Sequence, residues 1–252
     1  MFAKKSKGNK VQLVKDQFKS GRSREHGFLH IPKTGGSGVN ALGRTLHDRG
    51  YKSPCVFSHG WKVEEILNHF PDIKISFVLR DPLSRMISGF NSRVRQGRPT
   101  YNNIWTPAEA TAFNLFPSIE KLLDAVLAED EFSKSAVAYT MRNVTHLRWN
   151  YAFYFKNPDT VRSNRSSFEL IGTMDNMDEF IKGYTAMAGA SASTAAELYE
   201  KRHESKVRSE DALGKYTEED ISRIKAFMEK EYRIYSELLS IAGRSQPQNP
   251  QP

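Results

Sequence analysis

A glycine-rich segment between a strand pattern and a helix pattern holds the residue types that bind phosphate or sulfate groups. It reads His30-Ile31-Pro32-Lys33-Thr34-Gly35-Gly36-Ser37-Gly38. Glycines let backbone N–H groups turn toward an anion, and the N-terminus of a helix adds partial positive charge. The lysine and two hydroxyl groups complete a set of anion donors. In the nucleotide triphosphatase loop the lysine follows the glycines, whereas here it precedes them. An ordinary glycine-rich turn is the alternative.

A second segment with phosphate-binding chemistry begins at Arg80 and reads Arg80-Asp81-Pro82-Leu83-Ser84-Arg85-Met86-Ile87-Ser88. Arg80 falls at the carboxyl end of a strand pattern, where open parallel sheets bind ligands. Ser84 and Ser88 are four residues apart, so they share one side of the following helix. A guanidinium fork together with a serine hydroxyl suits a second phosphate. The alternative is that Arg80 pairs with Asp81 and both serines face solvent.

Taken together, the two segments resemble the signatures of sulfotransferases that use 3′-phosphoadenosine 5′-phosphosulfate. The similarity is greatest to the carbohydrate-type branch with a Pro-Lys-Thr-Gly-Gly opening. This branch includes bacterial members and, more distantly, the uronyl 2-O-sulfotransferases of heparan sulfate. The resemblance is strong over residues 26–95 and weaker through residues 168–172 and the final helix. Residues 97–165 resemble no pattern of the family and are expected to form an acceptor-site insertion.

The resemblance implies in-line transfer of a sulfuryl group to an acceptor hydroxyl, with adenosine 3′,5′-bisphosphate as the product. Lys33 would stabilise the charge that develops on the leaving phosphate. The loop from Lys33 to Gly38 would hold the 5′-phosphosulfate, through backbone amides and the hydroxyls of Thr34 and Ser37. Arg80 and Ser88 would hold the 3′-phosphate. The family requires no metal, and a saccharide or similar metabolite is the expected acceptor.

A hydroxyl acceptor needs a general base, and His59 is the candidate because it directly follows a short strand pattern. That position would place it at the same sheet edge as Lys33 and Arg80, and the related uronyl enzymes have a histidine at a comparable place. A loop histidine bonded to backbone is the alternative, and Glu64 or Glu65 would be a competing base.

Two further groups of basic residues have less definite roles. The resemblance suggests that Lys206 and Arg208, in a polar stretch before the last helix, contact the 3′-phosphate. The alternative, a solvated linker, is slightly favoured. Arg93, Arg95 and Arg98 could attract an anionic acceptor, or they are exposed helix charges. His30 is expected to pack in or beside the sheet.

The order of local patterns predicts an α/β fold with a parallel central sheet flanked by helices, as in the P-loop-like sulfotransferase fold. Strand patterns cover residues 27–31, 54–58, 74–79 and 168–172. Asp81 is suited to cap the helix that begins at Pro82. Residues 97–117 read as a long loop or lid, and one long helix is expected from the Thr217–Asp220 capping box to Gly243. A single domain over residues 26–243 follows, with a disordered tail over 244–252.

The composition and charge distribution limit the class of protein and its location in the cell. The chain has 252 residues with 38% hydrophobic content, enough for a sizeable core, and its lone Cys55 excludes a disulfide scaffold. Residues 1–25 contain eight basic and two acidic side chains, a charge of +6 out of the total of +8, and are expected to form a flexible basic leader. No stretch reaches the roughly 18 apolar residues of a membrane span, and no secretory signal is evident, which favours the cytoplasm.

Two other classes of protein compete with a sulfotransferase. A small-molecule kinase would need the triphosphate loop and a magnesium-binding acid, and the order of residues in the loop argues against it. A basic module that binds nucleic acid through residues 1–25 would show salt-sensitive binding, but the chain contains no nucleic-acid motif, so a nucleic-acid partner is not expected. The oligomeric state does not follow from the sequence.

Overall fold

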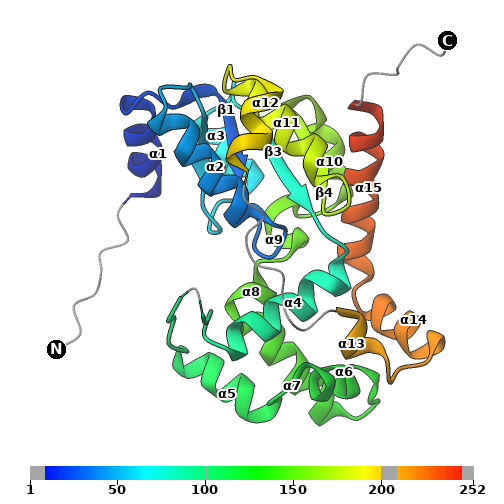
Figure 1. The fold of residues 1–252 in the computed structure, drawn as a ribbon. Helices are drawn as coiled ribbons and strands as arrows, with labels where there is room; N and C mark the ends of the chain where they lie inside the picture. Colours follow the sequence, from blue (N-terminus) through cyan, green and yellow to red (C-terminus); the bar gives the residue numbers. More distant parts are fainter. Residues whose placement is uncertain (1–8, 100, 200–208, 246–252) are drawn as a thin grey trace. The chain divides into compact units, whose positions relative to one another are not determined.

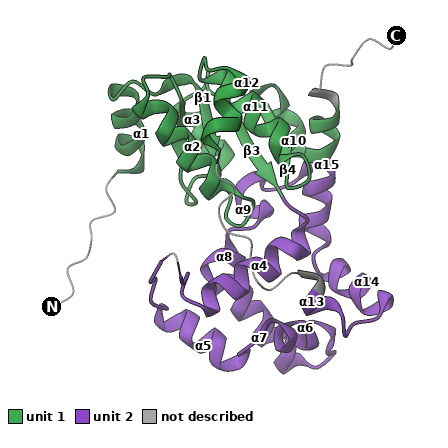
Figure 2. Ribbon diagram, viewed as in Figure 1, with its two compact units in different colours: residues 1–79, 159–202, 238–252 green, residues 80–158, 203–237 purple. Residues whose placement is uncertain are grey.

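The computed structural model describes residues 9–99, 101–199 and 209–245, and the chain divides into two compact units (Figures 1 and 2). Unit 1 comprises residues 1–79, 159–202 and 238–252, and unit 2 comprises residues 80–158 and 203–237. Each unit contains its own cluster of buried apolar side chains. The chain first passes from unit 1 to unit 2 at the bond between Leu79 and Arg80.

Unit 1 contains a sheet whose strands all run parallel, in the order β2-β1-β3-β4. The strands are β1 (Ser23–Leu29), β2 (Pro54–Phe57), β3 (Lys74–Leu79) and β4 (Phe168–Thr173). The helices are α1 (Lys10–Lys19), α2 (Gly36–Asp48), α3 (Val63–His69), α10 (Pro158–Ser163), α11 (Met177–Met187) and α12 (Ala192–Leu198), and η1 (Arg165–Ser167) is a short 3-10 turn. This arrangement confirms the predicted α/β class with a parallel sheet flanked by helices.

Both faces of the sheet are covered, which explains why its strands are nearly continuous apolar runs. On one face, Phe28 of β1 and Val78 of β3 belong to a buried cluster with side chains of α2, α11 and α12. On the other face, the ring of Phe57 packs against the rings of Trp61 and Phe70. Each of these pairs removes apolar surface from water and so stabilises the unit.

The order of the strands places a topological switch point between β1 and β3. The chain moves from β1 through α2 to β2 on one side, and then returns through α3 to β3 on the other side of β1. In open parallel sheets, ligands bind at the carboxyl ends of the strands beside such a switch point. The glycine-rich segment is the loop that follows β1.

Unit 2 is built from helices around an apolar core of its own. Its helices are α4 (Pro82–Val94), α5 (Pro107–Leu115), α6 (Ile119–Leu127), α7 (Glu131–Asn143), α8 (Thr145–Arg148), α9 (Tyr151–Phe155), α13 (Ser209–Leu213) and α14 (Glu218–Phe227), and α15 (Glu229–Ser245) has residues in both units. Pro82 occupies the first turn of α4, and Asp81 caps it by accepting a hydrogen bond from the Ser84 N–H at 2.8 Å, as its sequence predicts.

The structure differs from the sequence predictions at three places. Residues 10–19 of the expected flexible leader form α1, which contacts β2 and buries Val14. Residues 107–115 of the expected loop form α5, because Thr106 and Glu109 make a capping box that the sequence analysis overlooked. The expected final helix is interrupted at Met228, which separates α14 from α15, and α15 continues past Gly243 to Ser245. The Thr217–Asp220 capping box is confirmed.

Candidate functional site

The glycine-rich loop places the N-terminus of α2 at the carboxyl end of β1. β1 ends at Leu29, residues 32–35 form a turn, and α2 begins at Gly36. Gly35 is the N-cap with φ of 79°, and Lys33 also has a positive φ, of 70°. Gly35 has no side chain to cap the helix, and the Gly38 N–H donates to the Gly35 carbonyl oxygen at 3.1 Å. The N–H groups of Gly36 and Ser37 are therefore the ones that suit a ligand, and the helix dipole favours an anion there. Lys33 holds a left-handed conformation that is rare for a residue with a side chain.

Two glycines of the loop are needed for close packing. A Cβ atom on Gly36 would overlap the imidazole ring of His30, and one on Gly38 would lie 3.2 Å from the ring of Tyr199. Both neighbours belong to unit 1. The overlap with His30 therefore requires glycine at position 36, whereas a Cβ at position 38 would make only a tight contact with Tyr199.

The two hydroxyl groups of the loop differ in their surroundings. The Thr34 side chain is fully buried, and its Oγ1 donates a hydrogen bond to the Ile31 carbonyl oxygen at 3.0 Å. Its proton is therefore used inside the loop rather than on a ligand, contrary to the expected role of that hydroxyl. Ser37 is exposed at the start of α2. Of the two hydroxyls, Ser37 is the one that fits an incoming anion.

His59 follows β2 and joins its loop to the loop after β1. Its Nδ1 atom lies 2.6 Å from the His30 carbonyl oxygen, and the two imidazole rings have centroids 4.2 Å apart. A carbonyl oxygen only accepts, so Nδ1 carries the proton and Nε2 keeps its lone pair. Burial lowers the pKa of His59 below its usual 6.5; the bond to His30 opposes this, and the charge of Lys33 adds to it. His59 is therefore a neutral imidazole at pH 7, as a general base requires.

His30 has a further partner on α2. The Asn40 side-chain nitrogen lies 2.8 Å from Nδ1 of His30, and the His30 ring also stacks on Phe28. His30 is half-buried at the end of β1. Asn40 was not among the predicted site residues, although it falls one helical turn after Gly36 and so lies on the same side of α2.

A lysine of α1 holds the loop that contains His59. Lys10 Nζ donates to the Gly60 carbonyl oxygen at 3.0 Å, lies 2.5 Å from Glu65 Oε2 and sits 4.6 Å from the centre of the Trp61 ring. Glu65 is thus an ion-pair partner of Lys10, which disfavours it as the competing base. Lys10 falls in the expected flexible basic leader, and its partners could not be predicted because they lie about 50 residues away in the chain.

Arg80 and Ser88 belong to unit 2, and both are half-buried there. The hydroxyl of Tyr151 fixes the backbone of Arg80, since it donates to the Arg80 carbonyl oxygen at 2.6 Å and accepts from the Arg80 N–H at 2.9 Å. Asp81 accepts hydrogen bonds from the Ser84 N–H and from the Tyr232 hydroxyl, the latter at 2.9 Å.

The buried Arg85 lies in this same part of unit 2. It donates to the carbonyl oxygens of His146 at 3.2 Å and Trp149 at 3.0 Å, and its guanidinium lies over the Tyr151 ring at 5.4 Å. Glu231 accepts from the Tyr151 N–H at 2.7 Å. These contacts order the segment that positions Tyr151, and the sequence offered no signal for them because the partners are distant in the chain.

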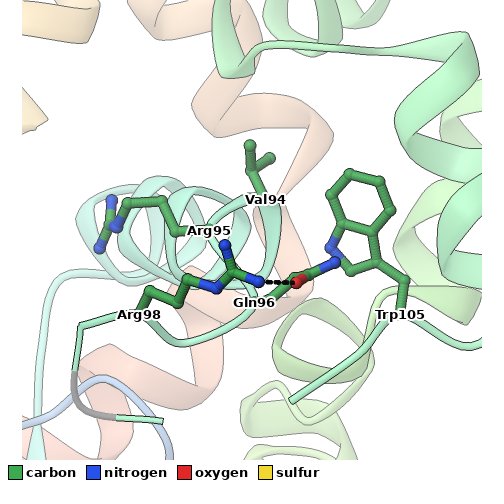
Figure 3. A pocket seen from close by; sticks show the side chains of 5 residues that line it. All are labelled: Val94, Arg95, Gln96, Arg98 and Trp105. Carbon is green, nitrogen blue, oxygen red and sulfur yellow. Dashed lines mark hydrogen bonds between the residues drawn. The ribbon is translucent and has the colours of Figure 1, made fainter. Parts of the chain in front are cut away.

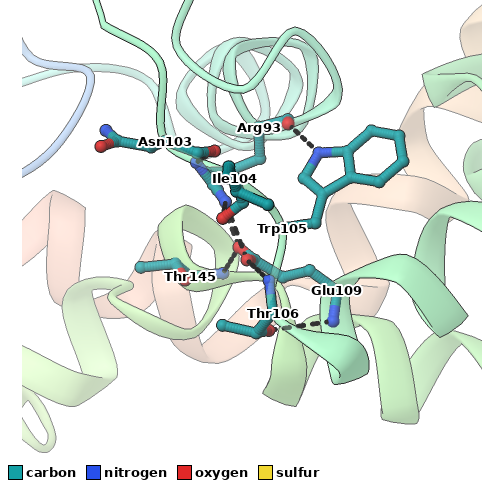
Figure 4. A network of polar contacts seen from close by, with 7 residues as sticks. All are labelled: Arg93, Asn103, Ile104, Trp105, Thr106, Glu109 and Thr145. Carbon is teal, nitrogen blue, oxygen red and sulfur yellow. Dashed lines mark hydrogen bonds and ion pairs between the residues drawn. The ribbon is translucent and has the colours of Figure 1, made fainter. Parts of the chain in front are cut away.

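Among the three arginines proposed to attract an acceptor, Arg93 has a structural role instead (Figure 4). Its guanidinium makes two bonds to the Glu109 carboxylate, at 2.7 and 2.8 Å, and both side chains are almost fully buried. A buried pair of this kind is not available to a ligand. Arg95 and Arg98 are exposed and line a cavity (Figure 3).

The structure thus brings residues 33–38 and His59 together at the carboxyl ends of β1 and β2 in unit 1. It places Arg80 and Ser88 in unit 2. Lys206 and Arg208 lie outside the described residues. Within the described ranges, no group of three or more His, Cys, Asp or Glu side chains could hold a metal ion. Over the same ranges, no helix is both long and apolar enough to cross a bilayer.

Comparison with known protein families, with curated proteins and with solved structures finds no match to this chain.

Proposed function

We propose that this protein is a sulfotransferase that moves a sulfuryl group from 3′-phosphoadenosine 5′-phosphosulfate to an acceptor hydroxyl, with a carbohydrate as the acceptor class. One observation carries the proposal: the loop with Lys33 follows β1, a neutral His59 follows the adjacent β2, and the charge of Lys33 acts on the imidazole. A cation for the leaving phosphate and a base for the acceptor are the two groups that the reaction needs.

The residues at the carboxyl end of β1 fit the phosphosulfate end of the donor. N–H groups of the first turn of α2, the exposed Ser37 and the Lys33 ammonium would hold the phosphosulfate. From the resemblance, Arg80 and Ser88 would hold the 3′-phosphate, and Lys206 and Arg208 would contribute to the same end. The donor, when bound, supplies a sulfuryl group attached to a good leaving group.

In the proposed reaction, Nε2 of His59 accepts the proton of the acceptor hydroxyl. A bond forms between the acceptor oxygen and sulfur, while the bond between sulfur and the bridging oxygen breaks. The electron pair of the broken bond stays on the leaving phosphate. The Lys33 ammonium stabilises that charge in a partly dehydrated setting, where such an interaction is stronger than in water.

Cytoplasmic localisation is part of the proposal. Cys55 is the sole cysteine, it is buried within β2, and burial raises the pKa of its thiol to about 12. A thiol with so high a pKa remains protonated and is inert as a nucleophile. A reducing compartment agrees with this inert, unpaired thiol.

Calorimetry with adenosine 3′,5′-bisphosphate tests the nucleotide site. We expect the bisphosphate to bind to the wild-type chain. Arg80→Ala should lower the affinity for the bisphosphate roughly tenfold or more, and it should lower the affinity for adenosine 5′-phosphate much less. Lys52→Ala, at an exposed position in the same unit as the loop, is the matched control and should bind as the wild type does. Absence of heat with the bisphosphate, or equal losses for both nucleotides, contradicts the proposal.

A transfer assay with labelled donor and a panel of saccharides tests the chemistry. Lys33→Ala should lose most of its turnover, whereas Lys52→Ala should keep it. His59→Gln should lower the rate while the affinity for the bisphosphate stays near the wild-type value, because its role is proton transfer. Transfer of phosphate from ATP instead would favour a kinase, and salt-sensitive binding of nucleic acid without nucleotide binding would favour a basic module.

A further inference from the structure

The segment after α4 is fixed by a buried ion pair in unit 2 (Figure 4). Besides its two bonds to Glu109, the Arg93 guanidinium donates to the Asn103 carbonyl oxygen at 3.2 Å. Glu109 also accepts from the N–H groups of Thr106 and Thr145, each at 3.1 Å. A satisfied buried network of charges holds its members in one arrangement. The Arg93–Glu109 pair therefore holds Asn103 and Thr106 to the end of α4.

The Trp105 side chain is positioned by the same network. Its indole Nε1 donates to the Arg93 carbonyl oxygen at 2.6 Å, and its ring lies against that of Phe113, with centroids 4.9 Å apart. The indole is half-buried. One part of the ring thus rests on the core while another part remains available to a ligand.

This half-buried indole and two arginines line a shallow cavity of about 480 Å³ that is largely open to solvent (Figure 3). Its lining residues are Val94, Arg95, Gln96, Arg98 and Trp105. Two of the five carry a positive charge and none carries a negative one. A volume of this size accommodates a small ring compound.

The C-terminal dipole of α4 disfavours an anion nearby, but the last carbonyl groups of the helix already accept hydrogen bonds, which weakens this effect. Ser92 O accepts from the Gly97 N–H at 2.9 Å, and Arg93 O accepts from the Gln96 N–H at 2.9 Å as well as from Trp105. Arg98 is held by the side-chain oxygens of Gln96 and Asn102, at 3.2 to 3.3 Å. The Arg98 guanidinium therefore has a fixed orientation, which reduces the entropy lost on binding.

We propose that this cavity binds a carboxylate that is carried on a ring. The Arg95 guanidinium is a planar donor group that matches a carboxylate, and Arg98 adds its positive charge and the Nη1 donors that Gln96 and Asn102 do not use. The indole of Trp105 presents a flat apolar surface to the ring. Gln96 adds an amide for a polar substituent. The site lies in unit 2 among residues 94–105 and does not depend on the sulfuryl-transfer proposal.

The indole N–H signals of the three tryptophans, in a proton–nitrogen correlation spectrum of the full chain, provide the test. Trp105→Phe identifies the Trp105 signal. Benzoate and glucuronate are the charged probes, benzamide and glucose are their uncharged counterparts, and inorganic sulfate is an anion without a ring. We expect at least one carboxylate to shift the Trp105 signal in a saturable way. The carboxylate with the higher affinity then shows whether the cavity prefers an aromatic ring or a sugar ring.

Variants that remove a positive charge test whether the change in the Trp105 signal comes from binding in the cavity. Arg95→Gln and Arg98→Gln should each weaken binding of the effective carboxylate roughly tenfold, because each removes one charge-assisted bond. Arg142→Gln, an exposed arginine on α7 of the same unit, should leave it unchanged. Unshifted signals of Trp61 and Trp149 in the unliganded variants show that the fold is intact. The proposal is overturned if neither carboxylate moves the Trp105 signal, if the uncharged or ringless probes bind as well, or if the variants bind normally.

Discussion

The Nδ1 atom of His59 lies 2.6 Å from the carbonyl oxygen of His30, and this bond links the loops that follow two adjacent parallel strands. It fixes which imidazole nitrogen carries the proton and therefore leaves Nε2 as the basic atom. The bond also makes the position of the imidazole depend on the glycine-rich loop, because His30 is the residue at which that loop begins.

The charge of Lys33 should be measurable at His59 without any ligand. Burial and the Lys33 charge both lower the pKa of His59 below 6.5, so Lys33→Ala should raise that pKa, whereas Lys33→Arg should leave it low. Titration of the His59 ring signals by nuclear magnetic resonance checks this. An unchanged pKa in Lys33→Ala would mean that the two side chains do not interact.

Alanine at Gly36 should destabilise unit 1, because its Cβ would overlap the ring of His30. We expect a loss of about 1–3 kcal/mol in the free energy of unfolding, as for other overpacked sites. Gly60→Ala is the control, since nothing lies within 4 Å of a Cβ at that position. Urea unfolding of both variants measures the difference, and equal stabilities would show that His30 moves away without cost.

Gln17 on α1 should stabilise the edge of the sheet. Its side-chain amide donates to the Val56 carbonyl oxygen at 3.0 Å and accepts from the Val56 N–H at 2.8 Å, as a neighbouring strand would. Gln17→Ala leaves the N–H and the carbonyl oxygen of Val56 without this partner. It should lower the free energy of unfolding by about 1–3 kcal/mol. Gln12→Ala, on the exposed side of α1, should change the free energy of unfolding by less than about 0.5 kcal/mol. Similar values for the two variants would contradict the assigned role.

The Arg93–Glu109 pair should make unit 2 sensitive to acid. Burial by itself would raise the pKa of Glu109, but the bonds from Arg93, Thr106 and Thr145 prevail and lower it to about 2 from 4.5. Because the folded pKa is depressed, the stabilisation is present above pH 4.5 and is lost as the pH falls toward 2. Urea unfolding across that pH range should show a steeper decline in the wild type than in Glu109→Gln, which keeps only the contribution of other carboxylates with lowered pKa, such as Asp124 and Asp130.

At neutral pH, Glu109→Gln should cost about 3–5 kcal/mol, because it leaves the Arg93 charge buried without its counterion. Replacing both residues by leucine should cost less than this single change. Glu131→Gln, at an exposed position on α7, is the surface control and should stay within about 0.5 kcal/mol of the wild type. A small loss in Glu109→Gln would show that water reaches the pair.

Much of the sheet could be predicted because its signals are local. The apolar run of β3 and the capping of α4 by Asp81 depend on residues within a few positions of one another. The helix α1 could not be predicted in the same way. Its charged side chains suggest a solvated segment, and the partners that fix it, such as Val56 and Glu65, lie about 40 to 55 residues away.

The residue types of the candidate site likewise come from the sequence, since a lysine beside three glycines and a histidine after a strand can be recognised one segment at a time. Tertiary contacts decide which of these side chains are bonded within the protein and which are left for a ligand. Packing directs the Thr34 hydroxyl to Ile31, buries Arg93 against Glu109 and fixes the proton of His59 through His30. The sequence determines which groups are present, because strand and helix signals are short-range. The tertiary structure decides which of these groups still face a ligand, because burial and hydrogen bonding depend on partners that only folding brings close.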